Sequence, residues 1–126
     1  MIRKYWMPLA WTAIILILCL MPKSAEPEAS WLTKIPHFDK IIHWGLYAVL
    51  AFLFFISNTK NISLKFGLFV ISYAIFLGGV IEIIQPFVGR SNEWADLFAD
   101  IIGCVCGIIA FQLIGDRFLK IFGSRK

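Results

Sequence analysis

Charged side chains are scarce in this sequence. Asp, Glu, Lys and Arg make up 16% of its 126 residues, whereas 60% of the residues are hydrophobic, and the mean hydropathy is +0.80. A soluble core of this size needs far less apolar sequence. The charges fall in clusters between long apolar runs, so the composition excludes an ordinary soluble domain and indicates an integral membrane protein.

Cysteine is rare as well, and motifs of known chemistry are missing. Nothing in the sequence resembles a nucleophile elbow, a Cys/His pair or a zinc motif. Cys19, Cys104 and Cys106 lie inside apolar runs and are odd in number, so we interpret them as packing residues and not as a disulfide or a metal site. Enzyme status is left open. The cofactors are unknown, although the carboxylates could hold a divalent cation.

Four apolar runs predict an all-α fold, an integral membrane bundle of four transmembrane helices with short loops. Only the third run is comfortably long, and the others reach a spanning length of ~17 residues by borrowing polar flanks. We treat the whole chain, 1–126, as a single transmembrane domain that ends in a basic cytoplasmic tail. The predicted helices are about 6–21, 41–56, 64–85 and 97–114, and the tail is 115–126.

The distribution of basic residues predicts how the helices cross the membrane. Eight of the twelve Lys and Arg residues lie in the N-terminus, the second loop and the C-terminal tail, and four lie in the first and third loops. Cytoplasmic segments carry the excess of Lys and Arg, so both termini are predicted to be cytoplasmic. The net charge of +4 then reflects topology, and we expect no nucleic-acid partner.

Three polar residues share one face of the second predicted helix. Asp39, His43 and Tyr47 follow i, i+4, i+8 spacing, so a carboxylate, an imidazole and a phenol descend from the outer surface into the membrane. One interpretation is a membrane anchor, with Asp39 favoured by the helix dipole and Tyr47 in an aromatic belt. The other is a functional site. The sequence leaves both open.

Small residues form stripes on the third and fourth predicted helices. In the third, Ala74 and Gly78 lie at four-residue spacing, and the fourth contains a GxxxG match at Gly103 and Gly107. Such stripes allow close helix packing. We predict that the two stripes pack antiparallel against each other.

That packing would gather carboxylates near the outer surface. It would carry Glu82 to within a turn of Asp96 and Asp100, beneath Arg90 in the connecting loop. A carboxylate alone in hydrocarbon costs about 2.5 kcal/mol or more, so such groups face a bundle interior or a watery cavity and have partners. We expect Glu82 to be partnered by Arg90, by His43 or by both, and this cluster is the candidate functional site.

The spacing of these polar residues resembles the VanZ-like family, multi-pass membrane proteins named for a link to low-level teicoplanin resistance. The family pattern is roughly D-K-x-x-H-x-x-x-Y, then E-x-x-Q, G-R, a downstream D and N-x-x-G, and the resemblance covers about 39–107. Asp100 stands where the family often has Asn, which adds a possible negative charge. The signature positions are Asp39, Lys40, His43, Tyr47, Glu82, Gln85, Arg90, Asp96 and Asp100.

The resemblance implies a multi-pass protein of the bacterial cytoplasmic membrane but supplies no reaction. One hypothesis is that the outer-face cluster binds or processes an anionic cell-envelope lipid or a peptidoglycan-linked substrate, with a link to teicoplanin resistance. Arg90 and Lys40 suit a phosphate, and His43 could act as acid or base.

The alternative hypothesis is a non-catalytic interaction or accessory protein. Its buried polar residues would then be structural and fix one packing of the helices. A small transporter subunit is a weaker third hypothesis, because the first two helices carry no charge at mid-membrane. The expected partners are membrane lipids. Short helices with polar faces could also associate into a homo-oligomer.

Overall fold

The described part of the chain is entirely helical. The computed structural model describes residues 3–22, 24, 31 and 34–122, and no strand occurs among them. This confirms the predicted all-α fold with four helices. The helices are α1 (Trp6–Leu20), α2 (Phe38–Ser57), α3 (Leu64–Ile84) and α4 (Trp94–Phe122), with short 3₁₀ helices η2 (Thr59–Asn61) and η3 (Gln85–Val88).

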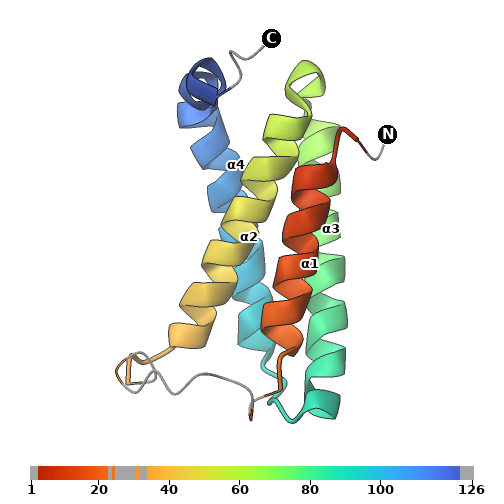
Figure 1. Cartoon of the computed structure of the whole chain (residues 1–126), viewed down its shortest axis with the longest axis vertical. Helices are drawn as coiled ribbons and strands as arrows, with labels where there is room; N and C mark the ends of the chain where they lie inside the picture. Colours follow the sequence, from red (N-terminus) through yellow and green to blue (C-terminus); the bar gives the residue numbers. More distant parts are fainter. Residues whose placement is uncertain (1–2, 23, 25–30, 32–33, 123–126) are drawn as a thin grey trace.

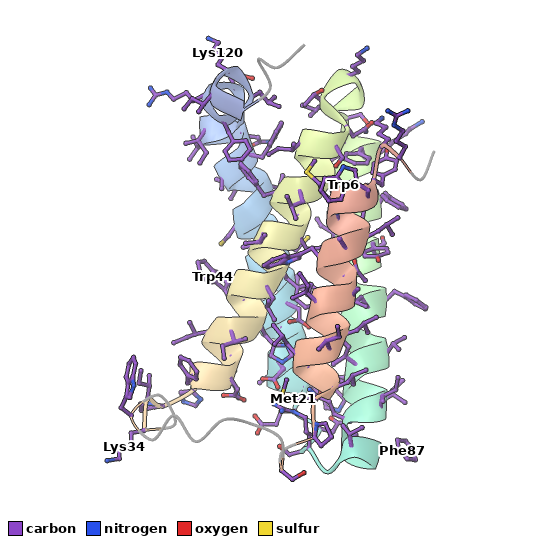
Figure 2. All side chains as sticks on the ribbon, viewed as in Figure 1. Trp6, Met21, Lys34, Trp44, Phe87 and Lys120 are labelled. Atoms are coloured by element: carbon purple, nitrogen blue, oxygen red, sulfur yellow. The ribbon has the colours of Figure 1, made fainter. Side chains whose placement is uncertain are left out.

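Successive helices run in opposite directions along one bundle axis (Figure 1). The start of α1 and the end of α4 therefore lie at the same end, which Trp6 and Lys120 mark in Figure 2. Met21 and Phe87 mark the opposite end. We call the first the basic end and the second the acidic end, where α1 and α3 finish and α2 and α4 begin.

Three of the four helices are long and apolar enough to cross a membrane, namely α2, α3 and α4. The remaining helix, α1, has 15 residues. Its length is therefore about 22 Å, which is shorter than the hydrocarbon core of a bilayer, about 30 Å. The outward faces are apolar: Ile17, Phe76 and Leu113 are among the most exposed side chains. A bundle that displays such residues requires lipid as its surroundings.

Helices α2 and α4 are longer than their predicted spans, whereas α1 and α3 each end one residue early. Helix α2 begins at Phe38 and not at Ile41, because Asp39 lies favourably in its first turn. Helix α4 begins at Trp94 and continues past Ile114 to Phe122. Most of the predicted tail is thus helical, and the remainder, 123–126, lies outside the described residues.

The glycine stripe of α4 packs against α2, so the predicted partner, α3, is wrong. A Cβ atom at Gly103 would lie 2.2 Å from the Trp44 carbonyl oxygen, and one at Gly107 would lie 2.1 Å from that of Ala48. The backbones of α2 and α4 touch at these two glycines. A stripe of small residues indicates that some backbone comes close, but it does not identify which helix supplies it.

The predicted stripe of α3 does face α4, through other residues. A Cβ atom at Gly78 would lie 2.5 Å from Asp100 Oδ2 and 2.9 Å from Leu97 Cδ1. Ala74, one turn away, is fully buried. Helix α4 is therefore held between two neighbours, with α2 against its glycines and α3 beside Asp100.

Aromatic rings fill the basic half of the bundle. The rings of Phe54 and Tyr73 lie 5.1 Å apart, and Phe55 lies 5.2 Å from Phe66 and 5.4 Å from Phe111. Contacts of this kind add to the packing of three helices. Polar side chains, in contrast, gather in the acidic half.

The glycine contact predicts the effect of adding one methyl group. Gly103→Ala should lower the free energy of unfolding by about 1–3 kcal/mol or more, because the new Cβ atom meets backbone that cannot rotate away. Gly79→Ala is the matched control, since its Cβ atom would meet nothing within 4 Å. Unfolding in detergent measures both. Equal stability of the two variants would contradict the α2–α4 contact.

Candidate functional site

The acidic end collects polar side chains because helices start and stop there. Asp39 lies in the first turn of α2 and Asp96 in the first turn of α4, where the helix dipole favours carboxylates. Gly89 adopts a positive φ of 77° and turns the chain after η3. This turn returns the backbone to the bundle just before α4.

His43 is the centre of the buried part of this cluster. Its Nδ1 lies 2.8 Å from Asp100 Oδ1, and its Nε2 lies 3.9 Å from Asp96 Oδ2 and 4.0 Å from Cys19 Sγ. All four side chains are buried. The imidazole, which α2 contributes, thus lies between two carboxylates from α4 and a thiol from α1.

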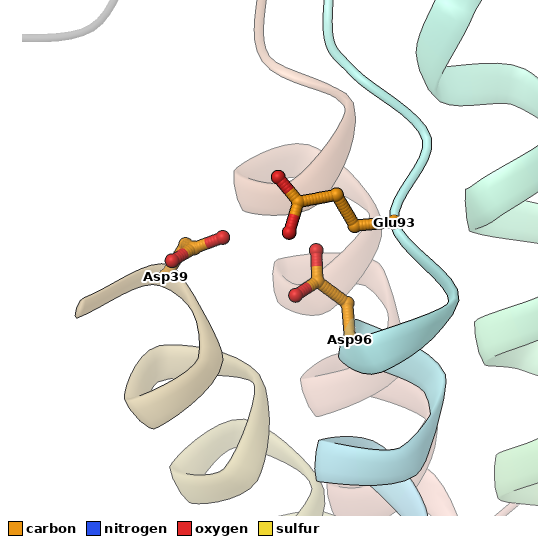
Figure 3. A group of neighbouring side chains, drawn as sticks. All are labelled: Asp39, Glu93 and Asp96. Atoms are coloured by element: carbon orange, nitrogen blue, oxygen red, sulfur yellow. The ribbon is translucent and has the colours of Figure 1, made fainter. Parts of the chain in front are cut away.

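Lys40 is surrounded by three carboxylates at the surface of the acidic end. Its Nζ donates to Glu93 Oε2 at 2.6 Å and lies 3.4 Å from Asp39 Oδ2 and 3.5 Å from Asp96 Oδ1. Figure 3 shows the three carboxylates turned toward one another from α2, the loop before α4, and α4. The ammonium group therefore joins the start of α2 to the start of α4.

The same three carboxylates are the residues that could hold a divalent cation. Ligand oxygens of Asp39, Glu93 and Asp96 all lie within 4.8 Å of one another, and oxygen donors suit Ca²⁺ or Mg²⁺. Lys40 already places a positive charge among them. A metal ion would fit this donor set only if the ammonium group moved away.

Glu82 lies deeper, on the last turn of α3, and is fully buried. Its Oε2 accepts a hydrogen bond of 2.9 Å from the backbone N–H of Glu93. The bond comes from the loop backbone and not from Arg90 or His43, the two partners that the sequence predicted. The loop before α4 is thereby tied to α3.

Gln85 and Arg90 bind the end of α1. Gln85 Nε2 donates to the Cys19 carbonyl at 3.3 Å, and Arg90 Nη1 donates to the Met21 carbonyl at 3.3 Å. Gln85 is buried, whereas Arg90 is partly exposed. These bonds satisfy carbonyl groups that a helix C-terminus leaves without intrahelical partners.

Buried oxygen atoms of the cluster that have no hydrogen-bond partner among the described residues include Glu82 Oε1 and Gln85 Oε1. The hydroxyl of Tyr47, one turn below His43, is placed to donate to Asp100. Buried polar atoms in folded proteins are nearly always paired. The acidic end therefore offers acceptor oxygens to a group that donates hydrogen bonds.

The structure brings all nine predicted site residues to the acidic half and adds two that the sequence analysis missed. Glu93 was missed although it is acidic and immediately precedes α4. Cys19 was assigned to packing, because nothing in the sequence indicates which helix faces the end of α1. Cys104 is buried as expected.

The fold and the cluster define a small multi-pass membrane protein with an acid–base network at one end of its helices. The VanZ/LLP1 family model matches residues 1–115. The chain therefore belongs to this family. No curated protein and no solved structure matches it.

The carboxylate cage predicts a specific response to loss of its cation. Lys40→Met should lower the midpoint of thermal unfolding by several degrees, because three carboxylates are left facing one another without a positive charge. Millimolar Ca²⁺ should restore part of the loss, since the oxygens are then free to bind it. Lys65→Met, at the basic end, is the control and should show neither effect. A Lys40→Met protein with unchanged stability would contradict the role of the ammonium group.

Proposed function

We propose that this VanZ-like membrane protein binds, at its acidic end, the polar group of an anionic cell-envelope lipid or of a peptidoglycan-linked substrate. The observation that carries the proposal is the set of buried acceptor oxygens without partners around His43. A network that served packing alone would leave few such atoms, because each costs about 1–3 kcal/mol. A ligand with hydroxyl or amide groups would satisfy them.

The charges suggest how such a ligand would be oriented. The deep part of the cluster is acidic, so it suits the hydroxyl or amine groups of a head group and not its phosphate. Arg90 is partly exposed and donates to the Met21 carbonyl. Its guanidinium group is the one suited to a phosphate, since guanidinium groups bind phosphate oxygens in pairs. Lys40 is less suited, because three carboxylates surround it.

A second function is favoured by the number of internal bonds. His43, Lys40 and Glu82 all bind groups on other helices or loops, so the cluster could act as structural glue in an accessory protein. Interactions of this kind in membranes contribute about 0.6 kcal/mol each. The two functions differ in what a conservative change should do.

The variant Glu82→Gln distinguishes the lipid-binding function from the structural one. The amide keeps an oxygen for the Glu93 N–H but removes the charge and one acceptor, so folding should be nearly unchanged. Binding of an anionic phospholipid or a polyprenyl phosphate, measured by native mass spectrometry, should fall at least about tenfold. Teicoplanin susceptibility of cells that carry the variant should change in parallel.

Arg90→Ala should weaken binding of the phosphate group in the same assay, and thermal unfolding provides the control for both variants. Lys65→Ala, at the basic end, should bind lipid as the parent does. If binding falls only in step with thermal stability in both Glu82→Gln and Arg90→Ala, the structural function is correct and the lipid site is not.

We also propose that the acidic end faces outward and that both termini are cytoplasmic. Described basic residues at the opposite end include Lys4, Lys60, Lys65, Arg117 and Lys120, and an excess of basic residues is typical of the cytoplasmic side. An outward acidic end would place the site in contact with envelope lipids of the outer leaflet.

Single cysteines at positions 60 and 90, introduced into a cysteine-free background, test this orientation. A membrane-impermeant maleimide added to whole cells should label position 90 and spare position 60, whereas lysed cells should label both. Labelling of position 60 from outside, with position 90 protected, would reverse the orientation and remove the site from the outer leaflet.

A further inference from the structure

Cys19 lies beside the imidazole of His43, in the last turn of α1. Its Sγ is 4.0 Å from His43 Nε2, the ring nitrogen on the side away from Asp100. The thiol is only 3% exposed. Cys104 and Cys106 are free as well, but no polar contact to the cluster is shown for either of them.

The three side chains form a sequence of nucleophile, base and orienting group. Asp100 Oδ1 accepts a hydrogen bond from Nδ1 at 2.8 Å. With its proton on Nδ1 the neutral imidazole has its lone pair on Nε2, which faces both Cys19 Sγ at 4.0 Å and Asp96 Oδ2 at 3.9 Å. A nucleophile near a base that a third group orients is the arrangement of covalent catalysis, and the nucleophile–base distance is often longer without substrate.

Gln85 supplies an independent indication of a ligand at this position. It is 1% exposed, its Nε2 binds the Cys19 carbonyl at 3.3 Å, and its Oε1 has no hydrogen-bond partner among the described residues. A buried amide oxygen on the side chain that binds the Cys19 backbone therefore lacks a hydrogen-bond donor, and a ligand could supply one.

We propose that Cys19 is a nucleophile that accepts an acyl group from a carboxylic ester of an anionic glycerophospholipid, with His43 as the base and Asp100 as a positioning residue. The inference rests on the proposed lipid site and narrows its substrate. A glycerophospholipid has head-group hydroxyls for the acceptor oxygens, a phosphate for Arg90 and an ester carbonyl for the thiol. A polyprenyl phosphate has no such carbonyl.

Transfer of the acyl group to Cys19 needs no reagent other than the lipid ester. His43 Nε2 takes the thiol proton of Cys19 while the sulfur attacks the ester carbonyl carbon and forms a C–S bond. The C–O bond of the ester then breaks, and the leaving alcohol takes the proton from Nε2. The product is a thioester on Cys19 and a lysophospholipid. Water, or a hydroxyl or amine of an acceptor, can later release the acyl group with the proton returned through His43.

The experiment uses the full chain in lipid nanodiscs that contain an anionic glycerophospholipid with alkyne-tagged acyl chains. The parent protein should acquire a tag that neutral hydroxylamine removes, and mass spectrometry should place it on Cys19. Cys19→Ser should abolish this tag. Cys106→Ser, the matched control, should retain it in full.

Asp100→Asn tests the orienting group. Labelling should fall about 100-fold, the range that a misdirected base costs, with thermal unfolding measured alongside. A loss of labelling at a parental midpoint of thermal unfolding is an outcome that a purely structural role of Asp100 would not give.

The outcomes separate this inference from the lipid site itself. If the protein binds anionic phospholipid but Cys19 carries no more tag than Cys106, the nucleophile is wrong and the binding site stands. If Cys19 is tagged while Asp100→Asn labels at the parental rate, the triad is wrong. If neither binding nor tagging occurs, both proposals are overturned.

Discussion

The close approach of α2 and α4 is the contact on which the acidic end depends. Gly103 and Gly107 let the α4 backbone touch the carbonyl groups of Trp44 and Ala48. At that separation His43, the residue before Trp44 on α2, reaches Asp100, three residues before Gly103 on α4, at 2.8 Å. A bulkier side chain at either glycine would move the imidazole away from its carboxylate. The packing of two backbones therefore determines the chemistry of the cluster.

Charge is compensated in layers at this end of the bundle. The outer layer is a cage of three carboxylates around one ammonium group, and the inner layer is an imidazole between two carboxylates. Asp96 belongs to both layers. Carboxylates at this depth are costly unless they are paired, so the Lys40 ammonium group and the His43 imidazole hold together groups that would otherwise repel. Removing either group should disturb both layers, because they share Asp96.

The sequence predicted the all-α fold and four helices because apolar runs and charged breaks are strong signals. It also selected the polar residues that meet at the acidic end, since their spacing placed them on helix faces near one surface. The partner of the GxxxG stripe could not be predicted, because α2 and α3 both offer small residues. The place of Cys19 depends on how α1 rotates against α2, and no residue spacing encodes that rotation. The hydrogen bond from the backbone N–H of Glu93 to Glu82 could likewise not be predicted, because the sequence does not show which backbone groups come close to a side chain.

The end of the short helix α1 lies beside the acidic cluster, where a ligand would bind. With 15 residues, α1 is shorter than the other three, and its last turn ends beside the cluster, where Gln85 and Arg90 hold its carbonyl groups. Helix α1 is also anchored further back, where Trp11 Nε1 donates to the Leu46 carbonyl at 2.8 Å and the Thr12 hydroxyl lies 3.0 Å from that of Tyr73. A lipid head group that binds Gln85 and Arg90 would therefore compete only with the bonds at the last turn, the turn that carries Cys19, because the rest of the helix keeps its own contacts.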